Sequence, residues 1–121
     1  AFGVQSSDDE MLSALSRVQM LDVLKERAGS AKAALALPMA SLSAGQARRV
    51  LIARLLLRQA DTWILDEPDV HLDREAAHLV ASLLKEVSTQ KRVIVAAHGE
   101  AFRALADLKL CLSDAEEDAA L

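Results

Sequence analysis

The segment from Thr62 to Asp73, TWILDEPDVHLD, constrains the fold more than any other part of the sequence. It begins with a continuous apolar run, Thr62 to Leu65, which is typical of a buried strand in a parallel sheet. Two adjacent carboxylates, Asp66 and Glu67, end the run, and Pro68 has no N–H to continue the ladder. Open α/β sheets bind ligands beyond the carboxyl ends of their strands. The pair is therefore either part of a ligand site or a strand running into an acidic turn.

A strand, a helix and a second strand follow one another from Thr62 to Ala97. Asp73 is a suitable N-cap, and the apolar residues after it recur at helical spacing over about four turns. Arg92 to Ala97, RVIVAA, is a second apolar run of strand length. A connection of this length joins parallel strands, so His98 and Gly99 should lie at the same sheet edge as the carboxylates. Further on, we expect a short helix over 100–106 and a third strand over 108–112.

The first part of the chain predicts short helices. Residues 7–10, SDDE, form a capping box between Ser7 and Glu10, which places a helix start near Asp8. A second short helix follows over 21–28, and Gly29 is suited to end it in the left-handed region. We expect a loop or one irregular turn over 32–39. Such short amphipathic helices bury too little to be stable alone, so they should pack on the rest of the chain.

A longer and more apolar helix is predicted from Gly45 to Gln59. Because four arginines are its main polar interruptions, we expect most of its circumference to be buried. The arginines form either a phosphate-binding row or an edge that is solvated or paired with carboxylates, and we favour the edge. They are Arg48, Arg49, Arg54 and Arg58.

Composition narrows the range of functions. With 121 residues and a net charge of −4 at pH 7, the chain should form one small domain, and its acidity argues against a dedicated nucleic-acid binder. No apolar run reaches the roughly 20 residues of a membrane-spanning helix, and residues 1–10 lack the features of a signal peptide. Cys111, the single cysteine, fits a reducing cytosolic compartment, and we expect it to be a small buried apolar residue.

The order of the motifs resembles one family. Leu42 to Gln46, LSAGQ, resembles the LSGGQ signature of ATP-binding-cassette (ABC) ATPases, and a helix rich in leucine and arginine follows it. Next come a strand that is similar to Walker B, WILDEP, a D-loop ending in Leu72-Asp73, and a strand ending at His98. The resemblance covers Ser41 to Leu112 and implies an α/β fold. It implies a helical subdomain with the signature loop over 1–45, then the C-terminal part of a P-loop NTPase (RecA-like) core with parallel strands over 46–121.

The resemblance also implies a role for each site residue. A serine at a helix N-terminus offers a hydroxyl and unpaired N–H groups to a phosphate, although an ordinary serine N-cap has the same sequence. ATP and Mg²⁺ are the implied cofactors, and Mg²⁺ prefers hard oxygen ligands. A histidine at a strand end can alternatively be satisfied by the backbone. In the family's arrangement, Ser43, Ala44, Gly45 and Gln46 contact ATP bound to the partner subunit, Asp66 holds Mg²⁺ mostly through water, Glu67 is the general base, His98 contacts the γ-phosphate, and Asp73 in the D-loop connects the two sites.

Several residues depart from the family pattern. Ala44 replaces the first glycine of the signature pair, and Val70 replaces a D-loop serine that could bond across the dimer. His71 before Leu72-Asp73 resembles bacterial thiol exporters linked to cytochrome bd assembly. The phosphate loop GxxxxGK[ST] is absent, as are a base-stacking tyrosine and a convincing Q-loop. We therefore expect the C-terminal half of a nucleotide-binding domain, which alone neither binds MgATP tightly nor hydrolyses it.

These expectations define one function and two alternatives. The first is the ATPase module of a bacterial ABC exporter at the cytoplasmic face of the inner membrane, with a second nucleotide-binding domain and a transmembrane domain as partners, and without nucleic acid. The second is a soluble ABC-type ATPase acting on nucleic acid or ribosomes, a class that usually carries coiled-coil or basic insertions. The third is a non-catalytic half-domain that supplies only the signature in trans.

Overall fold

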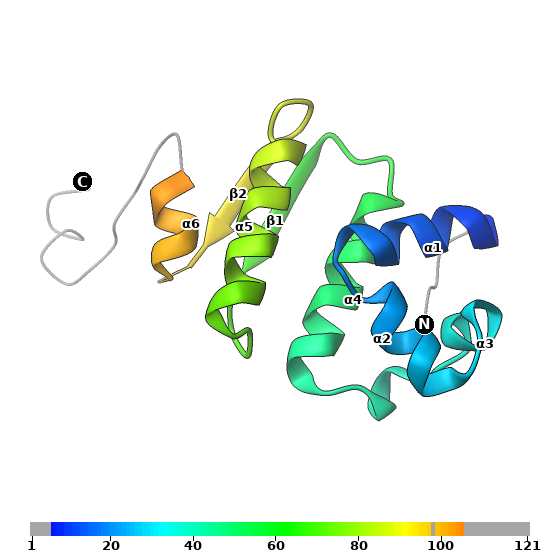
Figure 1. Ribbon diagram of the computed structural model, residues 1–121. Helices are drawn as coiled ribbons and strands as arrows, with labels where there is room; N and C mark the ends of the chain where they lie inside the picture. The colour runs from blue at the N-terminus through cyan, green and yellow to red at the C-terminus, as the bar shows by residue number, and fades with distance from the viewer. Residues whose placement is uncertain (1–5, 98, 106–121) are drawn as a thin grey trace, which may run out of the picture.

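The computed structural model describes residues 6–97 and 99–105, and the statements below concern these residues. Four α-helices gather in one part of the molecule, and a pair of strands with two further helices forms the other (Figure 1). In chain order the elements are α1 (Asp8–Arg17), α2 (Leu21–Ala28), α3 (Ala31–Leu35), the 3₁₀ helix η1 (Met39–Ser41), α4 (Ala44–Leu56), β1 (Thr62–Asp66), α5 (Arg74–Val87), β2 (Arg92–Ala96) and α6 (Glu100–Leu105).

The predicted helix boundaries of the first part are confirmed at two caps. Ser7 Oγ accepts from the Glu10 N–H at 3.1 Å, and the Glu10 carboxylate accepts from the Ser7 N–H at 3.1 Å. The Ser7 backbone N–H, and then its hydroxyl, lower the pKa of Glu10 by bonding its ionised form. Gly29 ends α2 in the left-handed region, with φ of 95°.

The prediction of a loop or one irregular turn over 32–39 is wrong for residues 32–35 and 39, and it is confirmed for 36–38, which lie between α3 and η1. Residues 31–35 form α3, and Ser30 caps it by accepting from the Ala33 N–H at 3.0 Å. The segment is rich in alanine, which has the highest helix propensity, but it lacks the apolar periodicity by which helices were identified. One alanine, Ala34, is buried in the core.

The helix predicted from Gly45 begins one residue earlier, and its burial is lower than expected. Figure 1 shows α4 beside α1, against which it packs. Val50, Ile52 and Ala53 are buried, but Leu51 is 44% exposed. The helix ends at Leu56 rather than at the predicted Gln59, so Arg58 lies beyond it. Within the described residues none of the four arginines forms an ion pair, which speaks against a carboxylate-paired edge.

The two strands form a parallel pair, as predicted. Thr62 is opposite Arg92 and Asp66 is opposite Ala96, so both strands end at one edge. Asp73 caps α5 by accepting from the Ala76 N–H at 2.7 Å. Helix α5 covers one face of the pair, and its apolar side belongs to one core with the inward side chains of β1. The core residues of these two elements are Trp63, Leu65, Val80, Ala81, Leu83 and Leu84.

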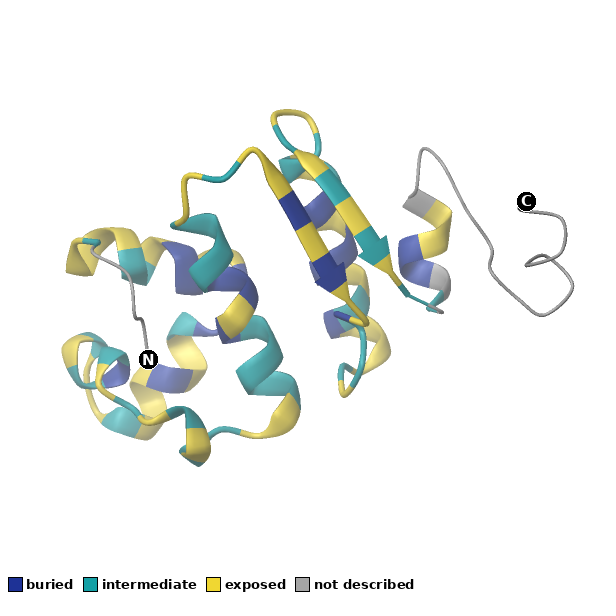
Figure 2. Ribbon diagram, turned by 180° about the vertical axis from the view of Figure 1, so that it is seen from behind, coloured by how far each residue is buried: buried dark blue, intermediate teal, exposed yellow. Residues whose placement is uncertain are grey.

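The other face of the strands is open, which corrects the prediction of a buried strand. Ile64 is 75% exposed and Ile94 is 56% exposed. Figure 2 shows the strands from this side, in front of α5, with exposed residues alternating along them. Among the helices of the described part, none is both long and apolar enough to cross a membrane.

The open face leads to a prediction for a matched pair of substitutions. Ile52 is 3% exposed in the core, and Ile64 is 75% exposed. In this chain, Ile52→Val should lower the free energy of unfolding by about 0.5–1.5 kcal/mol, because it removes a buried methyl group. Ile64→Val should change it by less than about 0.5 kcal/mol. Urea unfolding of both variants measures this difference, and equal losses would mean that the open face is covered in solution.

Candidate functional site

The acidic pair lies at the carboxyl end of β1. Asp66 and Glu67 are both exposed, and the Glu67 N–H donates to the Ala96 carbonyl at 2.6 Å. Glu67 has φ of 49°, in the left-handed region that non-glycine residues rarely adopt. Such a conformation costs about 1–3 kcal/mol, and residues in it gather at functional sites. The chain therefore turns away from the sheet directly after Asp66 and leaves both carboxylates accessible.

The described residues could hold a magnesium ion only together with ligands from a bound nucleotide and water. Among them there is no group of three or more His, Cys, Asp or Glu side chains that could hold a metal. Mg²⁺ bound with a nucleotide needs only one or two carboxylates, since water and phosphates supply its other ligands. Asp66, at the strand end, meets this requirement as a single carboxylate.

The signature segment forms the N-terminus of α4. Ser43 Oγ accepts from the Gln46 N–H at 3.2 Å, and Gln46 Oε1 accepts from the Ser43 N–H at 3.0 Å. This second capping box confirms the local N-cap role of Ser43 and occupies the Gln46 side-chain oxygen. The N–H groups of Ala44 and Gly45 belong to the first turn, which has no intrahelical acceptors for them. Ser43 and Ala44 are exposed, so the tip of the helix can meet a ligand.

Gly45 also has a packing role that the sequence did not predict. From the sequence, the small residues of the signature were explained only as allowing a phosphate to approach the backbone. In the structure, a Cβ at Gly45 would lie 2.7 Å from the His71 carbonyl oxygen. His71 itself has φ of 69°. The signature helix and the D-loop backbone are therefore in direct contact within this chain.

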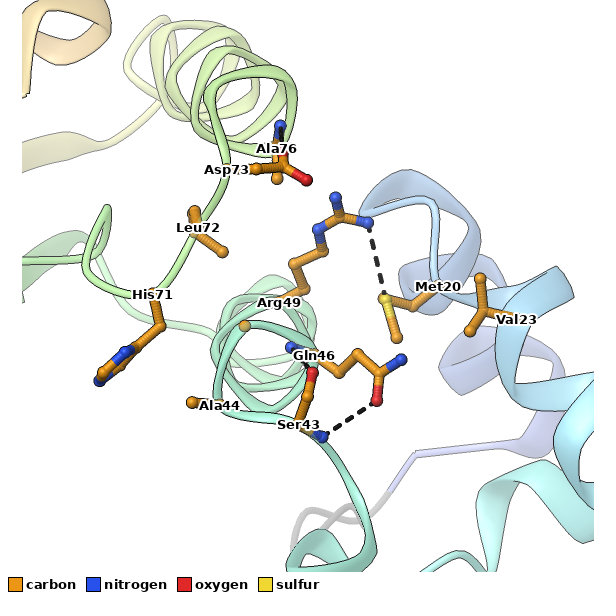
Figure 3. Close-up of a pocket in the computed structure, with 11 residues that line it drawn as sticks. Met20, Val23, Ser43, Ala44, Gln46, Arg49, His71, Leu72, Asp73 and Ala76 are labelled. Atoms are coloured by element: carbon orange, nitrogen blue, oxygen red, sulfur yellow. Dashed lines mark hydrogen bonds between the residues drawn. The ribbon is translucent and has the colours of Figure 1, made fainter.

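A cavity of about 480 Å³ lies where the signature, the D-loop and the helical part meet. Figure 3 shows Ser43 and Gln46 on one side of it and Leu72 and Asp73 on another, with Arg49 between. The half-buried Arg49 places Nη1 3.7 Å from Met20 Sδ. Arg49 follows Gly45 by four residues, so helical spacing could have placed it on this face. The sequence favoured an edge that is solvated or paired with carboxylates, over a phosphate-binding row, and did not predict that Arg49 lines this cavity.

The site residues fall into two groups. Ser43, Ala44, Gly45, Gln46 and Asp73 line the cavity of Figure 3. Asp66 instead lines a groove of about 130 Å³ between α4 and the open face of β1. Glu67 lines neither hollow, and His98 lies outside the described residues. The structure thus brings the signature and the D-loop together and keeps the acidic pair apart from them.

Several curated bacterial proteins are similar to this chain. It is 41% identical over 59 residues to the cytochrome c biogenesis ATP-binding export protein CcmA of Pasteurella multocida, covering 49% of this chain and 28% of that protein. It is 40% identical over 79 residues to the lipoprotein-releasing system ATP-binding protein LolD 1 of Caulobacter vibrioides, covering 64% and 34%. It is 40% identical over 70 residues to the glutathione/L-cysteine transport system ATP-binding/permease protein CydD of Haemophilus influenzae, covering 58% and 11%. The chain thus spans about a third or less of the length of these relatives.

Solved structures share the fold. The dimeric bacterial ABC transporter cassette MJ0796 matches with a TM-score of 0.65 and 25% identity over 88% of this chain and 44% of the cassette. A structure from work on ATP-driven dimerization and DNA-stimulated activation of SMC ATPases matches with a TM-score of 0.52 and 26% identity over 63% of this chain and 51% of that one. Residues 4–70, more than half of the chain, match the family model described as ABC transporter. These residues include the signature, the strand β1 and the acidic pair, and the chain belongs to the ABC transporter family.

Proposed function

We propose that this chain is the signature and Walker B part of the ATPase module of a bacterial ABC exporter. The observation that carries the proposal is the separation of the two site groups. Ser43 and Ala44 at the signature tip are exposed and line the cavity of Figure 3, whereas the exposed Asp66 lines the groove beside β1 and the exposed Glu67 lines neither. Each therefore needs a partner surface to complete a nucleotide site, as a dimer of two nucleotide-binding domains would supply. The division into a helical subdomain over 1–45 and a core part over 46–121 belongs to the same proposal.

In this proposal each group has a chemical task. Asp66 holds Mg²⁺, which neutralises charge on the phosphates when it is bound with ATP. Glu67, exposed beyond the strand end, accepts the proton of the attacking water as general base. Ser43 and the N–H groups of Ala44 and Gly45 bind the γ-phosphate of ATP on the partner, since a helix N-terminus favours an anion. Gln46 supports them through the capping box, Asp73 connects the two sites through the D-loop, and His98 contacts the γ-phosphate.

The relatives support the partners and the location. One is named an export protein, one a lipoprotein-releasing component and one an ATP-binding/permease protein. The cassette MJ0796 is described as dimeric. We therefore propose a second nucleotide-binding domain and a transmembrane domain as partners, at the cytoplasmic face of the inner membrane. The CydD similarity supports the thiol-exporter subfamily, to which the sequence HLD at 71–73 also points.

Hydrolysis should require residues that this chain does not contain. Its sequence has no phosphate loop, so the chain alone should neither bind MgATP tightly nor hydrolyse it. The exposed Leu51, Ile64 and Ile94 offer an apolar surface on which the rest of the domain can pack.

Mixing two purified parts tests the proposal. The chain should show no ATP hydrolysis, and adding the phosphate-loop part from its parent gene should restore phosphate release. A mixture in which this chain carries Glu67→Gln should stay inactive. Hydrolysis by the chain alone would contradict the proposal, and no gain on mixing would favour a non-catalytic half-domain.

The match to SMC ATPases favours one further candidate, a soluble ATPase that acts on DNA. The net charge of −4 speaks against it, because DNA binding needs a basic surface. Adding DNA to the active mixture separates the two functions, since only an SMC-like ATPase should be stimulated.

A further inference from the structure

The side chain of Asp69 joins the acidic turn after β1 to the backbone after β2. The Gly99 N–H donates to Asp69 Oδ2 at 3.1 Å, across 30 positions in the sequence. Both residues are half-buried, so the bond is partly shielded from water. A bond from an amide to a carboxylate is about twice as strong as one between neutral groups.

Gly99 leaves room for this contact. A Cβ at position 99 would lie 2.5 Å from Asp69 Oδ2 and 3.4 Å from Asp69 Cγ. Real Cβ atoms essentially never come so close to another heavy atom, so any larger residue would push the carboxylate away. The pair of an aspartate and a glycine is therefore matched in shape as well as in hydrogen bonding.

The same turn carries Glu67. The Val70 N–H donates to the Glu67 carbonyl at 3.1 Å, and the Leu72 N–H donates to the Asp69 carbonyl at 3.1 Å. The bond from the Glu67 N–H to the Ala96 carbonyl and the bond from the Gly99 N–H to the Asp69 carboxylate then tie this turn to the end of β2. Glu67 is held in the left-handed region, and such a conformation persists only where the surroundings determine it.

We propose that Asp69 is a positioning residue for Glu67, acting through its bond to the Gly99 amide. The inference rests on the proposed role of Glu67 as general base. Losing the bond leaves only the backbone bond from Glu67 to Ala96 between the turn and β2, so the Glu67 carboxylate can shift from its working place. A misplacement of about 1 Å can slow catalysis by about 100-fold, so the effect belongs in kcat rather than in ATP binding.

The contact can be tested without any activity. The chain has four glycines, so selective ¹⁵N-glycine labelling gives few amide signals, and the Gly99 signal is identified by its absence in Gly99→Ala. In Asp69→Ala the Gly99 amide should exchange with deuterium about tenfold faster or more, as expected for losing a bond to a charged group. Asp69→Asn keeps an acceptor oxygen and should retain most of the protection. Asp61→Ala, which changes an exposed aspartate before β1, is the matched control and should leave exchange unchanged.

The catalytic role is tested in the full-length ATPase that contains this chain. Asp69→Ala should lower kcat by about 10- to 100-fold with the KM for ATP nearly unchanged, and Asp69→Asn should recover most of the rate. If Asp69→Asn lowers kcat as much as Asp69→Ala, or if neither variant changes the exchange rate of the Gly99 amide, the positioning role is wrong.

If Glu67→Gln leaves hydrolysis intact, the proposed function itself fails. If Glu67→Gln stops hydrolysis while Asp69→Ala does not change kcat, the role of Asp69 alone fails.

Discussion

In the ATPase that the proposed function assigns to this chain, Glu67→Gln should lower ATP hydrolysis by about 100-fold or more, which is the usual contribution of a general base. Glutamine keeps the size of the side chain but cannot accept the proton of the attacking water. The left-handed backbone at Glu67 and its N–H bond to Ala96 do not involve the side chain, so the turn should stay intact. Steady-state phosphate release measures the loss.

The same variant should still form the nucleotide-bound dimer. The signature tip at Ser43 and the D-loop at Asp73 are unchanged, and they line a cavity to which Glu67 does not contribute. Size-exclusion chromatography with ATP should therefore show dimer that persists longer than in the wild type, because hydrolysis no longer opens it. Glu75→Gln, an exposed change in the first turn of α5, is the control and should leave both readouts unchanged. Normal turnover in Glu67→Gln would remove Glu67 from the chemistry.

The elements around the site were predictable because their signals are local. Asp73 as N-cap, the helical spacing after it and the apolar run from Arg92 each require only a few neighbouring residues, and all three are confirmed. The parallel pairing follows from the length of the connection. Helix α3 was missed because its alanines favour a helix but do not form the pattern of apolar residues at helical spacing by which helices were predicted. The strand at 108–112 and the burial of Cys111 lie outside the described residues.

The contacts between elements could not be predicted in the same way. The bond from Gly99 to Asp69 spans 30 positions and follows from how the two strand ends lie, which no spacing rule encodes. The packing of Gly45 on His71 is hidden for the same reason, since a glycine in a signature already has an explanation. The apolar run at Ile64 predicted a buried position, but Ile64 is 75% exposed in the structure.

Gly45→Ala is the second change with a large expected effect, and its sign is informative. Helix propensity alone would make alanine better than glycine by about 1 kcal/mol in α4. The new Cβ, however, would lie 2.7 Å from the His71 carbonyl oxygen, which is backbone and cannot simply rotate away. Overpacking of this kind costs about 1–3 kcal/mol. We therefore expect a net loss of stability and a shifted D-loop, with ATP hydrolysis of the full-length protein reduced about tenfold or more.

Ala47→Gly is the matched control, because it makes the reverse change further along α4, at a residue that does not line the cavity. Ala47 is half-buried, and replacing it should lower the free energy of unfolding mainly through propensity, by about 1 kcal/mol, and should leave hydrolysis nearly unchanged. If only propensity mattered, the two variants would shift stability in opposite directions. If the packing of α4 on the D-loop matters, both lower it and only Gly45→Ala slows hydrolysis. Thermal unfolding together with phosphate release distinguishes these results, and a stabilised, fully active Gly45→Ala would show that His71 does not restrict the signature helix.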